Sequence, residues 1–147
     1  MRKKGLLGNK YNLGSQELRA QGVKCFIDEN AECDYELLTD KNYYDKAVSL
    51  VRRGGKKTAF FCSSDVYALE LFNRFKEENI QTPGDAGLMG FDNLDILDFI
   101  RPRTATVSTS VEIQGREVVN DLFALIAGET VQNVHYVPHQ ICPGETL

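Results

Sequence analysis

The sequence has few of the residues that build metal centres or disulfide frameworks. It contains four widely spaced cysteines and no Cys-x-x-Cys pair: Cys25, Cys33, Cys62 and Cys142. That pattern argues against both kinds of site. His135 and His139 have the four-residue spacing of a helical metal pair. Pro138 lies between them, in a segment that we predict to be extended, so their side chains should diverge. We therefore expect no bound metal.

Motifs for catalysis and for nucleotide cofactors are also missing. There is no Gly-x-Ser-x-Gly sequence, phosphate-binding loop or dinucleotide fingerprint. No nucleophile has an evident base beside it. We therefore expect no cofactor and no catalysis. The one enzyme hypothesis that stays open uses Asp65 and Asp92 as an acid/base or Mg²⁺ pair in a small α/β enzyme.

Excess positive charge and long apolar runs are lacking as well. The net charge of -4 argues against a nucleic-acid surface, which would normally be basic. No apolar run approaches the roughly 20 residues of a membrane span. The N-terminus begins like a signal peptide, but its apolar stretch is too short. We expect a cytoplasmic protein of one domain, because 147 residues can bury about 68–70% of the unfolded surface.

What the sequence does contain is an alternation of strand and helix patterns. Strands are expected at 5–8, 35–38, 58–62, 88–90 and 104–108, with a last extended segment at 134–142. Helices are expected at 15–30, 41–53, 66–79 and 111–127. Ser15 and Asp40 are predicted to cap the first two helices. The alternation predicts an α/β fold, with a parallel sheet and helices flanking both faces.

Polar side chains follow two of these strands at the point where each ends. The sequence TAFFCSSD places Ser64 and Asp65 after one strand, and LMGFDN places Phe91, Asp92 and Asn93 after the other. Ligands of open parallel sheets bind beyond the carboxyl ends of the strands. Carboxylates, amides and an aromatic ring there would suit a small polyhydroxylated ligand. A plain Asp-Asn turn is the alternative.

Arg19 is the candidate cation for the same edge of the sheet. It precedes Val23 by four residues and so shares the inward face of the first helix. With Asp65 and Asp92 it could form a polar clamp. The alternative is that Asp65 only caps its helix and Arg19 pairs with a surface carboxylate.

One long segment resembles a known family. TAFFCSSDVYALELFNRFKEENIQTPGDAGLMGFDNLDILDFIRPRTATVSTS resembles the effector-binding core of LacI/GalR-family transcriptional repressors. It has the apolar strand followed by polar-polar-Asp, the hydrophobic-Gly-Phe-Asp-Asn strand end, a Pro and a Thr-rich strand. The resemblance extends upstream through LRAQG and downstream to LIAGE, and so covers nearly the whole chain.

The resemblance implies roles for particular residues. Arg19, Asp65 and Asp92 fall on positions that hydrogen-bond a sugar or another small polar effector in the family's interdomain cleft. Ser64 and Phe91 lie beside them, and Phe91 would provide an apolar wall. The family's dimer surface would fall near Leu69 and Ile100.

The resemblance also implies an incomplete protein. Residues 1–147 correspond to the C-terminal lobe of a periplasmic-binding-protein-like (type I) fold, with no DNA-binding domain. Operator DNA would be bound only through a missing N-terminal domain. The helix within 111–128 would belong to the missing lobe. Its broad apolar stripe is therefore expected to pack on a second copy of the chain, in a homodimer or higher homo-oligomer, or to be exchanged between protomers.

These observations favour a ligand-sensing fragment of a LacI/GalR-type regulator, which changes the DNA-binding state of a dimer when effector binds. The alternative is a lobe of a periplasmic-type solute-binding protein for sugar transport. The lack of a signal peptide and the Gly-Phe-Asp-Asn motif count against that alternative.

Overall fold

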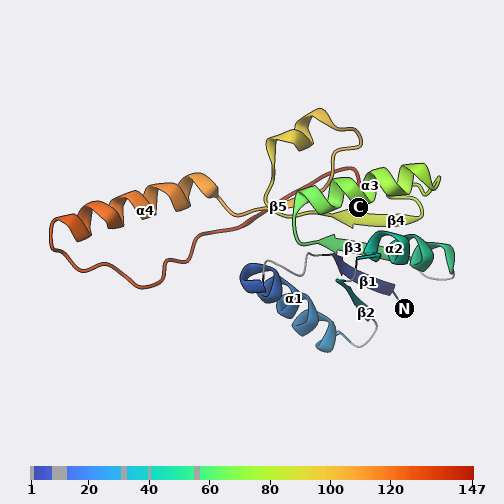
Figure 1. Cartoon of the computed structure of the whole chain (residues 1–147), viewed down its shortest axis with the longest axis horizontal. Helices are drawn as coiled ribbons and strands as arrows, with labels where there is room; N and C mark the ends of the chain where they lie inside the picture. Colours follow the sequence, from blue (N-terminus) through green and yellow to red (C-terminus); the bar gives the residue numbers. More distant parts are fainter. Residues whose placement is uncertain (1, 8–12, 31–32, 40, 55–56) are drawn as a thin grey trace.

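The computed structural model describes residues 2–7, 13–30, 33–39, 41–54 and 57–147 of the chain. Four parallel strands form the main sheet in the order β2-β1-β3-β4 (Figure 1). They are β1 (Arg2–Leu7), β2 (Cys33–Leu38), β3 (Thr58–Cys62) and β4 (Ala86–Met89). The connecting helices are α1 (Leu13–Asp28), α2 (Tyr43–Arg52) and α3 (Asp65–Glu77). The predicted α/β fold with a parallel sheet is confirmed.

The register brings the carboxyl ends of the central strands to one edge. Leu7 of β1 pairs with Cys62 of β3, and Phe61 pairs with Met89 of β4. A parallel bridge from Met89 to Ala105 leads into β5 (Thr106–Ser108). That strand pairs antiparallel with β6 (Gln140–Cys142). The last extended segment, predicted at 134–142, is therefore a strand only over its final residues.

One face of the sheet carries the hydrophobic core. Phe60 and Leu88 are 1% and 0% exposed, and they pack with buried residues of α2 and α3. The rings of Phe60 and Phe75 meet edge to face with centroids 5.5 Å apart, a favoured geometry for aromatic pairs. Burying each such side chain stabilises the fold by about 1.5–3 kcal/mol.

The other face is less completely covered. Alternate residues of β3 and β4, such as Phe61 and Met89, remain partly exposed. With Val23 and Phe26 of α1 they line an apolar groove of about 660 Å³. Helices therefore lie on both faces, but α1 leaves β3 and β4 partly open.

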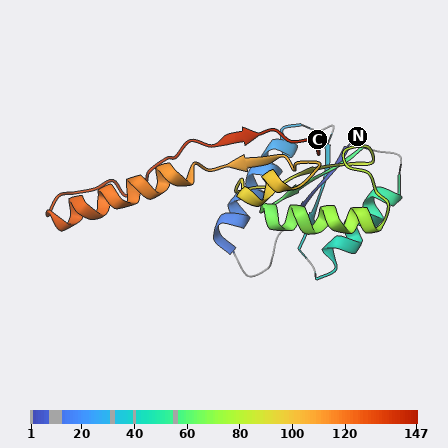
Figure 2. The ribbon, with the colours of Figure 1, turned by 90° about the horizontal axis from the view of Figure 1, so that it is seen from above.

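Helix α4 (Val111–Ile126) projects away from the body of the molecule as an arm (Figures 1 and 2). None of its residues is buried. Its large exposed apolar side chains are Val111, Ile113, Val118, Val119, Leu122, Phe123, Leu125 and Ile126. The segment that follows returns beside the helix. There His135 Nε2 lies 2.9 Å from Asp121 Oδ2, and this polar contact links the returning segment to the helix.

Several predicted element boundaries need correction. Helix α1 begins at Leu13, so Ser15 lies within its first turn and the predicted Ser15 cap is wrong. Asn42 occupies the N-cap position of α2, and Asp40 lies outside the described residues. Ser64 precedes α3 without a capping hydrogen bond from its side chain. Residues Asp95–Phe99 form a short 3₁₀ helix, η1.

Among the described helices, none is both long and apolar enough to cross a bilayer.

Candidate functional site

Three side chains meet at the carboxyl edge of the sheet. Arg19 of α1 places its guanidinium carbon 3.7 Å from the centroid of the Phe91 ring. Its Nη2 lies 3.5 Å from Asp92 Oδ1, and its Nη1 donates a hydrogen bond to the Ser63 carbonyl at the end of β3. Residues predicted from separate motifs, Arg19, Phe91 and Asp92, therefore form one cluster, which we call the rim.

The rim is partly open to solvent. The side chains of Arg19 and Asp92 are 22% and 36% exposed, so both charged groups can be reached by a ligand. Burial raises the pKa of Asp92, and the positive charge of Arg19 opposes that shift. A carboxylate accepts hydrogen bonds, a guanidinium donates them, and an aromatic face stacks on apolar ring surfaces. The combination matches the surface of a sugar.

The turn that carries the rim has an unusual backbone. Asp92 and Asn93 have φ angles of 105° and 54°, a region that costs non-glycine residues free energy. The turn is held against β5, because the amide of Asp92 donates to the Val107 carbonyl at 2.9 Å. Arg103 Nη2 donates to Asn93 Oδ1 at 3.1 Å. Backbone pairing and a side-chain contact together fix the direction in which Asp92 points.

Asp65 does not join this rim. It is 0% exposed and lies beneath the turn. Its Oδ1 accepts a hydrogen bond from the Thr106 hydroxyl at 2.5 Å, and its Oδ2 accepts one from the Leu94 amide at 2.8 Å. Burial raises the pKa of Asp65 despite these bonds. A polar clamp of Arg19 and both aspartates was expected. Only one of the two aspartates, Asp92, lies beside Arg19 at the rim.

The residues that support Asp65 were not predicted from the sequence. Gly90 lies so close that a Cβ built on it would sit 2.1 Å from Asp65 Oδ1. Thr106 lies 41 residues further along the chain. The only signal in the sequence was Gly90 at the end of an apolar strand. The sequence did not show that this glycine makes room for Asp65.

The remaining predicted residues are Ser64, Leu69 and Ile100. Ser64 is partly exposed directly before α3. Leu69 is also partly exposed, whereas Ile100 packs against the core. Beside Ile100, Phe99 is 83% exposed and Ile96 is 49% exposed. The dimer surface stays a prediction, and these two neighbours offer more exposed apolar surface to it than Leu69 and Ile100 do.

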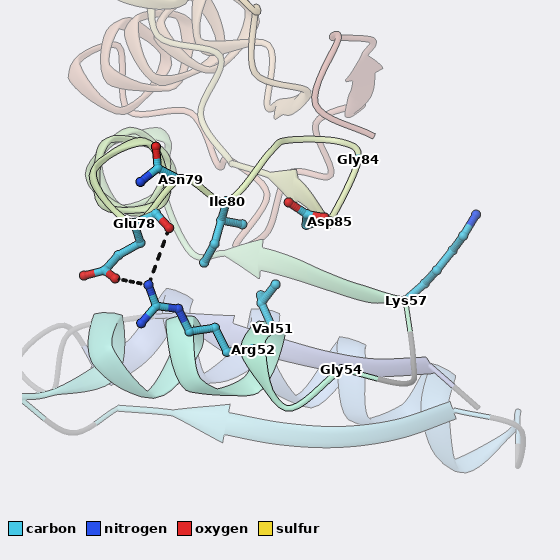
Figure 3. Close-up of a pocket in the computed structure, with 9 residues that line it drawn as sticks. All are labelled: Val51, Arg52, Gly54, Lys57, Glu78, Asn79, Ile80, Gly84 and Asp85. Atoms are coloured by element: carbon cyan, nitrogen blue, oxygen red, sulfur yellow. Dashed lines mark hydrogen bonds and ion pairs between the residues drawn. The ribbon is translucent and has the colours of Figure 1, made fainter.

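A second hollow, of about 580 Å³, lies at the opposite edge of the sheet (Figure 3). Its charged groups are mostly engaged within the protein. Arg52 Nη2 forms an ion pair with Glu78, and Asp85 Oδ2 accepts a hydrogen bond from the Gln81 amide at 2.8 Å. Lys57 extends away from the hollow. The described residues contain no cluster suited to holding a metal ion. The rim at the carboxyl edge is therefore the better candidate site.

Comparison with known proteins places the chain in a family. A model of the periplasmic binding protein-like domain matches residues 1–147. The repressor PurR of Vibrio atlanticus is 31% identical over 100 residues, covering 68% of this chain and 28% of that protein. The regulator MalR of Clostridium butyricum is 28% identical over 137 residues, covering 89% of this chain and 41% of that protein. The chain thus spans well under half the length of these relatives.

Solved structures show the same fold. A ribose operon repressor from Lactobacillus acidophilus superposes with a TM-score of 0.82 at 18% identity, over 99% of this chain and 55% of that one. A LacI-type regulator from Alkaliphilus metalliredigens, complexed with D-xylulofuranose, gives 0.81 at 20% identity, over 99% and 56%. The chain belongs to the periplasmic binding protein-like domain family.

Proposed function

We propose that this chain senses a sugar or a similar small polar effector within a LacI/GalR-type transcriptional regulator. The observation that carries the proposal is the meeting of Arg19, Phe91 and Asp92 at the carboxyl edge of the sheet. Solved structures of similar fold in complex with D-xylulofuranose and with cellobiose support a sugar as the effector. The chain performs no catalysis in this role. Its effect in the whole regulator is a shift between DNA-binding states on effector binding.

The proposal is tested by titrating the ¹⁵N-labelled chain with pentoses, glucose, maltose, cellobiose and lactose. We expect at least one sugar to shift the amide signals of Phe91 and Asp92. Asp92→Ala should weaken that binding at least tenfold, since it removes the exposed acceptor. Asp95→Ala is the matched control, because Asp95 is exposed on the neighbouring η1. Equal affinity in the Asp92 and Asp95 variants, or no shift with any sugar, would refute the assignment.

We propose further that α4 is an association surface. In the intact regulator residues 111–128 would pack on the other lobe of the effector domain. In solutions of this chain they would pack on a second copy or exchange between protomers. The support is the large set of apolar side chains on an arm that buries none of its residues, since such patches mark interfaces.

Light scattering at micromolar concentration tests this association. We expect a dimer or larger species, and Phe123→Glu should shift it toward the monomer because Phe123 is 67% exposed on the arm. Phe99→Glu, near the dimer surface predicted from Leu69 and Ile100, is the comparison variant. A monodisperse monomer of the unaltered chain would exclude both surfaces as sites of self-association.

The proposal includes one further partner, operator DNA. Operator DNA would be bound only by a separate DNA-binding domain, in agreement with the net charge of -4. The regulator would act in the cytoplasm, and its relatives are transcriptional repressors.

A lobe of a sugar-transport binding protein is the second candidate, because it would use the same rim. Finding the intact gene product in the periplasm would favour that candidate.

A further inference from the structure

We propose that Asp65 is the positioning residue of the rim: its buried carboxylate holds the turn from Phe91 to Leu94 in the shape that presents Phe91 and Asp92 to Arg19. The significance of this role for ligand recognition rests on the proposed function. The role itself concerns the structure of the turn, and it replaces a direct contact of Asp65 with ligand.

Asp65 contacts both ends of the turn. Its backbone amide donates to the Phe91 carbonyl at 2.7 Å, and its Oδ2 accepts from the Leu94 amide at 2.8 Å. Asp92 lies between these two fixed points, with its φ angle of 105°. A backbone in that region persists only where its surroundings hold it. Two anchors from one buried residue supply that constraint.

The third contact of Asp65 reaches the same turn through Thr106. The Thr106 hydroxyl accepts a hydrogen bond from the Asn93 amide at 3.3 Å and donates one to Asp65 Oδ1. The proton of Thr106 therefore points to Asp65, and the two carboxylate oxygens serve two separate donors. A carboxylate can accept at both oxygens, whereas an asparagine side chain offers one acceptor and one donor group.

The close packing of the Asp65 carboxylate on Gly90 leaves the carboxylate little room to move. Because a Cβ on Gly90 would sit 2.1 Å from Asp65 Oδ1, the carboxylate packs directly on the backbone where β4 ends. The charged and titratable groups around it are Asp92, which raises its pKa, and Cys62, whose own pKa is raised by burial and by Asp65. Arg19 pairs with Asp92, so within the described part of the chain the hydrogen bonds from Thr106 and Leu94 compensate the burial of Asp65.

The test compares Asp65→Asn and Asp65→Ala with Asp85→Asn as control. Asp85 also accepts a hydrogen bond from a backbone amide at 2.8 Å, but it is exposed at the opposite edge of the sheet. Hydrogen exchange of the ¹⁵N-labelled full chain is measured at the Leu94 and Asp92 amides. We expect protection there to fall at least tenfold in both Asp65 variants and to stay unchanged in the control.

A second readout separates positioning from general stability. Asp92→Asn should shift the Nε–H signal of Arg19 in the unaltered chain, because the two side chains lie together. The same substitution should leave that signal in place when Asp65 is Asn, since the turn no longer presents residue 92 to Arg19. Asp65→Asn keeps the side-chain volume and decides the question even if Asp65→Ala does not fold.

The outcomes are distinguishable from those of the proposed function, because no ligand is used. Unchanged protection of Leu94 in Asp65→Asn, or a persistent response of Arg19 to Asp92→Asn in that background, overturns the positioning role. Failure of every sugar to bind the unaltered chain overturns the proposed function and leaves the positioning result as measured.

Discussion

Replacing Gly90 with alanine tests the packing beneath the rim most directly. The added Cβ would lie 2.1 Å from Asp65 Oδ1 and 3.1 Å from Asp65 Cα. The φ of Gly90 is not in the left-handed region, so the backbone itself can accommodate alanine. Any loss of stability must therefore come from the collision with Asp65.

The expected loss follows from two contributions. Forcing a methyl group into a well-packed site typically costs about 1–3 kcal/mol. Moving the Asp65 carboxylate also weakens its bonds to Leu94 and Thr106, and a hydrogen bond to a charged group contributes about 1.5–3 kcal/mol. With one such bond lost, the two contributions together should lower the free energy of unfolding by about 2.5–6 kcal/mol.

Urea unfolding followed by circular dichroism measures this loss. With a slope of about 2 kcal/mol per molar urea, the urea midpoint should fall by about 1.3–3 M. Gly87→Ala on the same strand is the control, because its Cβ would meet Ala59 and Leu147 at an ordinary 3.5 Å. Its midpoint should stay the same or rise slightly. Equal midpoints for Gly90→Ala and Gly87→Ala would refute the close packing of Gly90 on Asp65.

Three further predictions concern the core, the thiols and pH. Phe75→Ala should lower the free energy of unfolding by about 3–5 kcal/mol in urea titrations, since Phe75 is fully buried. Thiol labelling at pH 8, read by peptide mass spectrometry, should modify exposed Cys25 readily. Cys62 should react only after unfolding, because burial raises its pKa. Because burial also raises the folded-state pKa values of Asp65 and Asp92, these groups should destabilise the fold as pH rises from about 4, the unfolded value. As pH rises from 4 to 7, the urea midpoint of the native chain should therefore fall relative to that of Asp92→Asn. A constant difference between the two midpoints over this pH range would contradict the prediction.

The sequence predicted the scaffold of the site well. Strand patterns at Thr58–Cys62 and before Gly90 placed two strand ends at one edge, as the register confirms. The helical phase of Arg19 with Val23 predicted an inward-facing cation, and Arg19 does reach the residues after β3 and β4. Such features were accessible because local periodicity and parallel topology alone determine them.

Details that depend on distant partners could not be predicted. The start of α1 at Leu13 instead of Ser15 reflects the weak signal of helix ends in sequence. The projection of α4 follows from the lack of any surface that buries it, although its apolar pattern resembles that of a packed helix. Only the three-dimensional arrangement shows that this apolar pattern has no partner within the described residues.

The two aspartates show most clearly why a sequence motif alone does not predict which side chain is exposed at the site. Asp65 and Asp92 each follow an apolar strand by a few residues, and both reach the same edge of the sheet. What separates them is the element that comes next. Asp65 is the first residue of α3, and its side chain is directed beneath the neighbouring turn. Asp92 sits in a left-handed turn, where the reversed backbone directs its side chain outward to Arg19. The same position after a strand therefore leaves one carboxylate partly exposed at the rim and buries the other beneath the turn.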